Sequence, residues 1–175
     1  MDISAETIKK LREMTSCGVI ECKKALEEAQ GNFDNAKDVL RKRGLEIAAK
    51  KAGRVAKEGR VESYIHPGSK IGVLVEVNSE TDFVARSEDF CRFTKDLAIH
   101  IAACNPPYLK KENIPVDVLK AQPDQEMFVK ETCLLAQPFV KDTSKTIQDY
   151  LNELIAKVGE NIFVNHFVRY KVGEN

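Results

Sequence analysis

Features that would direct the chain to a membrane or a secretory route are missing. No apolar run approaches the roughly 20 residues that cross a bilayer. Residues 1–6 have neither a basic region nor an apolar core, so no secretory signal is expected, and Arg- and Ser-rich transit character is missing too. We therefore expect a cytoplasmic protein without a membrane partner, although a processed organellar chain would look the same.

An excess of either charge and a pattern of paired cysteines are also missing. The 27 Lys and Arg residues balance the 27 Asp and Glu residues, which argues against a protein that wraps nucleic acid over its whole surface. The five cysteines are scattered without a CxxC motif, which indicates free thiols in a reducing compartment. Helical spacing predicts packing roles for Cys22, Cys91 and Cys104. The three histidines lie far apart, so no zinc site or cofactor is expected.

Motifs of covalent catalysis are missing as well. The chain has no phosphate-binding glycine loop, zinc-protease helix or nucleophile elbow. Cys17 could be an exposed thiol, but no orienting histidine is indicated near it. We therefore expect a protein that is not an enzyme.

What is present begins with three amphipathic helices. Ser4 and Asn32 are expected N-caps of the first and third, and Gly31 and Gly44 are expected to end the second and third. The apolar positions at helical spacing are Ile8 and Leu11 in the first helix, Val19, Cys22, Leu26 and Ala29 in the second, and Phe33, Ala36 and Leu40 in the third.

A basic stretch follows this helical unit. Residues 41–60 contain eight Lys and Arg residues against Glu46 and Glu58. We predict a helical bundle over 1–50, a basic linker over 51–60 and a second domain over 61–175. A solvated helix face between two domains is favoured over a nucleic-acid surface, because the whole chain is neutral.

The second domain opens with a strand period instead of a helical one. Alternating residues over 61–66 and 71–77 flank the turn sequence 67–70 and predict a β-hairpin. Helices are expected from Ser87 to the Asn105-Pro106 stop and from 142–144 to Gly159. A last strand over 162–170 has apolar residues on both faces and is expected to be interior or well covered. The fold class is therefore α+β, with a small antiparallel sheet packed against helices.

Two segments are unusual for purely structural roles, namely 14–19 between two helices and 78–86 between a strand and a helix. In the second, Phe83 stands among polar residues. Such a ring either fills the core under its loop or is displayed as an anchor. On composition alone the buried interpretation is favoured, because most Phe residues are buried.

These segments resemble bacterial translation elongation factor Ts from the first helix to the last strand. The matching sequences, in family order, are LREMTSCG at 11–18, ECKKAL at 21–26, AAKKAGR at 48–54, EVNSETDFVA at 76–85, QPFVKD at 137–142 and VGENI at 158–162. The resemblance implies that the N-terminal unit is a three-helix bundle of the ubiquitin-associated type.

Two departures from the family pattern affect what the resemblance implies. Ser16 and Cys17 replace the second and third residues of a Thr-Gly-Ala-Gly loop, while Thr15 and Gly18 are kept. The stretch 119–130 is short, where family members carry a longer charged helical insertion. Either this member has lost the insertion or those residues are absent from the chain, and any role of the insertion in dimer formation is open.

The resemblance implies a guanine-nucleotide exchange factor for the GTPase elongation factor Tu. Thr81, Asp82, Phe83 and Val84 would contact the GTPase and disturb its Mg²⁺ and phosphate site, with Phe83 displayed as the wedge. The N-terminal contact would use Thr15, Gly18 and Val19. A homodimer and a complex of two copies of each protein both remain open. The alternatives are an adaptor for ubiquitin-like or peptide ligands without exchange activity, and an RNA-binding protein that uses 41–60.

Overall fold

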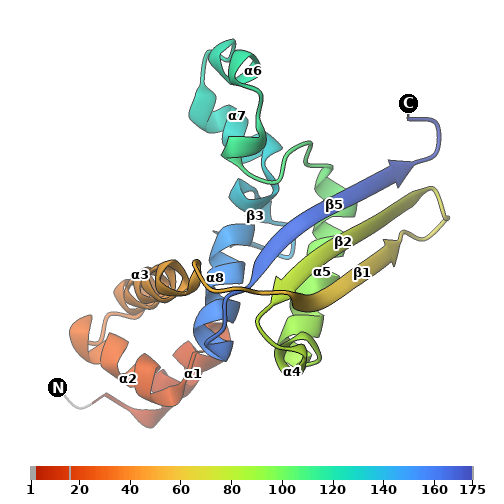
Figure 1. Cartoon of the computed structure of the whole chain (residues 1–175). Coiled ribbons are helices and arrows are strands. Elements are labelled where there is room, and N and C mark those ends of the chain that lie inside the picture. Colours follow the sequence, from red (N-terminus) through yellow and green to blue (C-terminus); the bar gives the residue numbers. More distant parts are fainter. Residues whose placement is uncertain (1–2, 16, 175) are drawn as a thin grey trace.

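The computed structural model describes residues 3–15 and 17–174, and it confirms the α+β class (Figure 1). Three N-terminal helices precede antiparallel strands that pack against further helices. In chain order the elements are α1 (Ala5–Thr15), α2 (Val19–Glu28), α3 (Phe33–Lys51), β1 (Glu58–Ile65), β2 (Ile71–Ser79), α4 (Asp82–Ala85), α5 (Glu88–Cys104), η1 (Lys111–Asn113), α6 (Val116–Lys120), α7 (Gln125–Thr132), η2 (Leu134–Ala136), β3 (Pro138–Phe139), β4 (Asp142–Thr146), α8 (Ile147–Val158) and β5 (Phe163–Lys171).

The first three helices close around a small core of their own. The expected caps are confirmed: Thr7 N donates to Ser4 Oγ at 3.1 Å, and Asn35 N donates to Asn32 Oδ1 at 3.0 Å. Gly31, at φ +81°, follows α2 and permits the reversal into α3. The buried residues of this cluster are Leu11, Cys22, Ala25, Leu26, Ala36 and Leu40.

The third helix is longer than predicted. Gly44 does not end α3, which continues to Lys51, so half of the basic stretch is helical and only 52–57 precede β1. Gly44 is buried where α3 crosses α8, and a Cβ on it would lie 3.8 Å from the backbone oxygen of Asn152. The glycine therefore lies inside α3 at its contact with α8 and does not terminate the helix. The domain boundary at residue 50 stays a prediction.

The predicted hairpin is confirmed and forms two strands of a three-stranded antiparallel sheet, in the order β1-β2-β5. Val73, Val75 and Val77 of β2 point into the core. In β1 the inward residue opposite Val75 is Glu62, which is 9% exposed, while Val61 on the other face is exposed. Val61 and Ile65 therefore lie on the outer face of the sheet, whereas Tyr64 packs against the core.

The last strand is an edge strand of the sheet, so of the two predicted positions, interior or well covered, the interior one is wrong. β5 pairs only with β2, and its register shifts between Glu76 and Val77. This irregularity breaks the strict alternation of faces. Val164 consequently faces the core, whereas Tyr170, expected on the same face, is 70% exposed.

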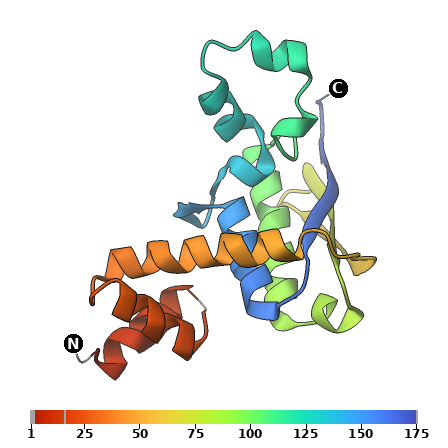
Figure 2. The ribbon, with the colours of Figure 1, turned by 60° about the vertical axis from the view of Figure 1, so that its left-hand side comes forward.

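One long helix covers the inner face of the sheet, and a second long helix packs against the first. Helix α5 packs on β1 and β2, and α8 packs between α5 and α3 (Figure 2). Ser87 and Gly159 bound these helices as expected, but residues 142–144 are not the cap of α8. They belong to β4, and Thr146 caps α8 by a reciprocal capping box with Asp149.

The remaining predictions concern the cysteines. All five, Cys17, Cys22, Cys91, Cys104 and Cys133, are free thiols, as expected. Cys22 is buried and Cys91 is half-buried, but Cys104 is exposed, so its predicted packing role is wrong. Separately, none of the helices within 3–15 and 17–174 combines the length and apolar character required to cross a membrane.

Candidate functional site

The segment 80–86, here called the exchange loop after the role that the resemblance implies for it, leaves the end of β2 and folds into the single turn α4. Thr81 begins this turn, since its Oγ1 accepts a hydrogen bond from Val84 N at 3.3 Å. Asp82 is exposed and pairs with Arg86 at 2.9 Å. The Phe83 side chain is 81% exposed, so the interpretation of this ring as a core residue is wrong and the displayed interpretation holds.

Val84, the fourth predicted contact, lies on the opposite face of the same turn. It is 7% exposed and belongs to the main hydrophobic core, as does Ala85. Its side chain is therefore an anchor that fixes the turn to the body of the protein. The turn is held from both sides, because Thr81 also donates through Oγ1 to Glu160 Oε1 at 2.7 Å.

The predicted N-terminal contact lies at the corner between α1 and α2. Gly18 and Val19 are exposed, whereas Thr15 is half-buried and donates through Oγ1 to Leu11 O at 2.8 Å. Ser16 lies outside the described residues. Sequence reasoning missed two apolar neighbours, Met14 at 53% and Ile20 at 69% exposure. Ile20 stands outside the apolar spacing of the second helix, and that signal could have found it.

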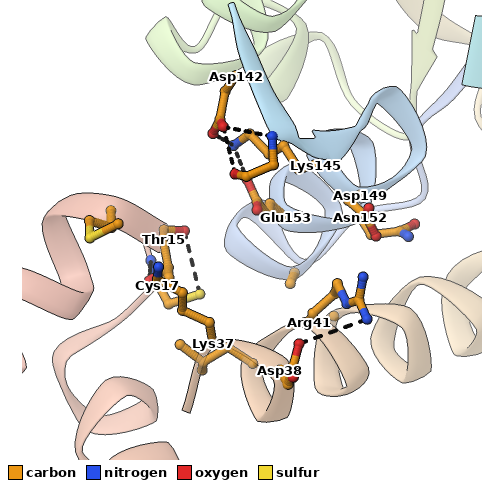
Figure 3. Close-up of a pocket in the computed structure, with 15 residues that line it drawn as sticks. Thr15, Cys17, Lys37, Asp38, Arg41, Asp142, Lys145, Asp149, Asn152 and Glu153 are labelled. Carbon is orange, nitrogen blue, oxygen red and sulfur yellow. Dashed lines mark hydrogen bonds and ion pairs between the residues drawn. The ribbon is translucent and has the colours of Figure 1, made fainter. Parts of the chain in front are cut away.

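Thr15 and Cys17 also line a cavity of about 170 Å³ between the bundle and the core (Figure 3). Glu153 and Lys145 lie across it, joined by a 2.8 Å hydrogen bond. Burial raises the pKa of Glu153, and the bond from Lys145 opposes this shift without overcoming it. Acidic and basic side chains lie next to one another around the cavity, and no residue of the exchange loop lines it. Its surroundings indicate a junction between the two parts of the chain.

The two predicted contact regions are not brought together into one site. They lie in separate parts of the molecule, but the bundle and α4 both lie at the end away from α6 and α7 (Figures 1 and 2). Both regions therefore lie toward the same end of the molecule.

Four basic residues of the stretch 41–60 form ion pairs with carboxylates. The pairs are Arg41 with Asp38 at 3.8 Å, Arg43 with Glu28 at 2.7 Å, Arg54 with Glu80 at 3.5 Å and Arg60 with Glu62 at 3.0 Å. These pairs favour a structural role over nucleic-acid binding. Among the described residues, no cluster of three or more His, Cys, Asp or Glu side chains could hold a metal ion.

Comparisons with known proteins agree over nearly the whole chain. The family model described as "Elongation factor TS" matches residues 2–127 and 124–174. The elongation factor Ts of Alkaliphilus oremlandii is 50% identical over 197 aligned positions that cover 99% of this chain and 91% of the relative. The proteins of the same name from Acetivibrio thermocellus and Caldanaerobacter subterraneus are 49% and 48% identical, covering 98% of this chain and 91% and 98% of the relatives.

The alignment also bears on the stretch predicted to be short. Its 197 positions exceed the 175 residues of the chain, so the Alkaliphilus relative has residues that this chain lacks. The two matched pieces meet at 124–127, within the stretch 119–130. In the structure the stretch 119–130 contains the end of α6, the connection that follows it and most of α7.

Proposed function

The chain belongs to the elongation factor Ts family, and from this premise we propose how its residues act on the GTPase. Members are nucleotide-exchange factors for elongation factor Tu in translation elongation, and they are not enzymes. The proposal concerns the steps by which this chain loosens GDP. It rests on the exposed ring of Phe83 at the tip of an anchored turn.

We propose that Phe83 enters the GTPase beside its Mg²⁺ and phosphate site. Mg²⁺ requires nearly ideal octahedral geometry, so a small displacement of the structure that supports it weakens coordination. A buried aromatic anchor can dominate the energy of an interface, and Phe83 is the aromatic ring that the exchange loop displays. Because the chain would bind the nucleotide-free GTPase best, linkage requires that it weaken GDP binding by the same factor.

The residues beside Phe83 would have different roles. Thr81 and Asp82 would hold the loop and approach the metal side of the site, since both present polar groups at the turn. The predicted contact by Val84 is revised, because its buried side chain supports the proposal only as the anchor behind Phe83.

The α1–α2 corner would make a second contact with the same GTPase. Met14, Val19 and Ile20 present exposed apolar side chains there, beside Gly18 and Thr15. Two linked contacts raise the overall affinity, because the first makes the second intramolecular. In this proposal residues 1–50 dock, 51–60 connect, and 61–175 carry the exchange loop.

The setting of this activity is proposed to be the cytoplasm, without a stable nucleic-acid or membrane partner. The adaptor alternative, which binds ubiquitin-like or peptide ligands through the bundle alone, leaves the displayed Phe83 without a role. That exposed ring therefore favours the exchange proposal.

For self-association we propose pairing of two copies through the outer face of the sheet. The face carries exposed apolar side chains from all three strands, namely Val61, Ile65, Leu74, Phe163, Val168 and Tyr170. Glu76 and His166, 3.2 Å apart, lie at the centre of this face, and a two-fold arrangement would pack the surrounding apolar side chains of two identical faces against each other. Sedimentation of the wild type and of Leu74→Arg tests this: the variant should be monomeric, and a monomeric wild type refutes the pairing.

GDP release from elongation factor Tu tests the exchange proposal. A fluorescent GDP analogue is followed with and without the chain, at several Mg²⁺ concentrations. The chain should accelerate release, and high Mg²⁺ should slow the accelerated reaction, because metal and exchange factor favour opposite states of the GTPase. Unchanged release at every Mg²⁺ concentration would instead support the adaptor alternative.

A further inference from the structure

The exchange loop is clasped by the segment that joins α8 to β5. The Glu160 carboxylate accepts two hydrogen bonds from one residue: Thr81 N donates to Oε2 at 3.1 Å, and Thr81 Oγ1 donates to Oε1 at 2.7 Å. These residues are separated by 79 positions in the chain. Gly159, at φ +76°, ends α8 in the left-handed conformation and reverses the chain immediately before Glu160.

The clasp is reciprocal. Asn161 N donates to Glu80 Oε1 at 2.6 Å, so each segment offers a carboxylate to the backbone of the other. Ser79 adds a third restraint, since its Oγ donates to Thr81 O at 2.9 Å. The contacts continue to the segment between α3 and β1, because Asn161 Nδ2 donates to Arg54 O at 2.7 Å.

The position of Thr81 decides where the Phe83 ring points. Helix α4 has four residues, too few to hold its own direction, and its buried anchors, Val84 and Ala85, follow Phe83. The restraint before Phe83 comes from Thr81, which caps α4 and contacts Glu160 through the same hydroxyl. Hydrogen bonds to an ionised acceptor are about twice as strong as neutral ones, so the carboxylate suits this task.

We propose that Glu160 is a positioning residue of the exchange loop, which holds Thr81 so that Phe83 meets the GTPase in one prepared orientation. This rests on the proposed wedge role of Phe83. Without Glu160 the turn would still be tethered by Val84 and Ala85 and by the contacts of Ser79 and Glu80. Thr81 would lose both of its bonds to the carboxylate, so the ring would sample more directions that do not enter the partner. The free-energy cost of ordering the Phe83 ring would then lower the rate of the exchange step itself.

A double-mutant cycle tests this role on the full chain. GDP release from elongation factor Tu is measured against the concentration of wild type, Glu160→Ala, Phe83→Ala and the double variant. Glu160→Ala should lower the maximal release rate about tenfold while leaving the half-maximal concentration within about twofold. In the Phe83→Ala background the same substitution should have no further effect, because no ring remains to be positioned.

Two further variants complete the design. Glu160→Gln keeps the shape but offers only one accepting oxygen, so its rate should fall between wild type and Glu160→Ala, and it replaces Glu160→Ala should the latter not fold. Glu126→Gln changes an exposed carboxylate on α7, at the far end of the molecule, and should leave exchange unchanged (Figure 1).

The outcomes separate the two proposals. A folded Glu160→Ala protein with the wild-type maximal rate, or independent effects of Glu160 and Phe83, overturns the positioning role alone. A Phe83→Ala protein that exchanges as fast as wild type instead overturns the wedge on which that role rests.

Discussion

Phe83 and Val84 are consecutive residues with opposite environments: the first is 81% exposed and the second is 7% exposed. A single helical turn thus carries both a side chain that is free to meet a partner and one that holds the turn in place. This pair allows function and stability to be perturbed separately at one place in the chain.

Replacing Phe83 by alanine should leave thermal unfolding nearly unchanged, within about 0.5 kcal/mol, because the exposed ring loses few contacts. The same variant should lose about 2 kcal/mol or more of binding to elongation factor Tu, which is the scale of an interface anchor. Val84→Ala is the matched control and should destabilise the fold by about 2 kcal/mol. Melting curves and GDP-release rates on both variants check this, and a strongly destabilised Phe83→Ala protein contradicts it.

Replacing Ile20 by serine should weaken the docking contact but spare the exchange step. Ile20 is 69% exposed at the α1–α2 corner, so the fold should tolerate the change. The concentration for half-maximal GDP release should rise several-fold while the maximal rate stays near wild type. Val116→Ser removes a side chain of similar exposure, 66%, on α6 and should change neither quantity. Equal behaviour of the two variants would argue against the corner as a contact.

Replacing Gly44 by alanine should stabilise the protein by up to about 1 kcal/mol, because glycine is unfavourable inside a helix. The new Cβ would lie 3.8 Å from Asn152 O, which is ordinary van der Waals contact. Denaturant unfolding gives the free energy directly. Gly44→Leu is the contrasting variant and should destabilise, since a large side chain would force α3 away from α8. A destabilised alanine variant would show that the helices approach more closely than described.

Acidification should destabilise the fold through His100. Burial lowers the pKa of this side chain, and the hydrogen bond with Gln137, at 2.9 Å, only partly offsets that effect. Its Nδ1 accepts from Val140 N at 3.2 Å, which requires the neutral ring. The ordinary pKa of about 6.5 applies to the unfolded chain, which therefore binds the proton more readily than the folded protein does. The free energy of unfolding consequently decreases as the pH falls from about 6.5 to the lowered pKa of the folded state. Melting temperatures between pH 7 and 5 should fall less for His100→Gln than for wild type.

Local features of the fold could be predicted well from the sequence. Asn32, Ser87 and Gly159 act at helix ends by short-range hydrogen bonds or backbone conformation, and each was identified. Gly44 was misread because a glycine that ends a helix and one that lies inside a helix look the same in one dimension. The irregularity between Glu76 and Val77, which reverses the faces of β5, depends on a partner strand and left no sequence signal.

The candidate site shows the same limit. The resemblance drew attention to Phe83, and the structure shows the ring exposed. It did not separate Phe83 from Val84, whose burial follows from packing against α5 and the sheet. Glu160 was not singled out as a site residue, because its contact with Thr81 spans 79 positions. Interactions of that length depend on how the two segments fold together.

Because α3 is uninterrupted, it fixes the rotation of the α1–α2 corner about the helix axis relative to the exchange loop. A helix rises about 1.5 Å and turns about 100° per residue, so every residue inserted between Leu40 and Gly44 would swing the bundle about the helix axis. One inserted residue would aim the α1–α2 corner away from its present side. An insertion of about one full turn would nearly restore its direction at a greater distance. In this family member, the helix that joins the two contact regions therefore also determines whether one partner can be reached by both.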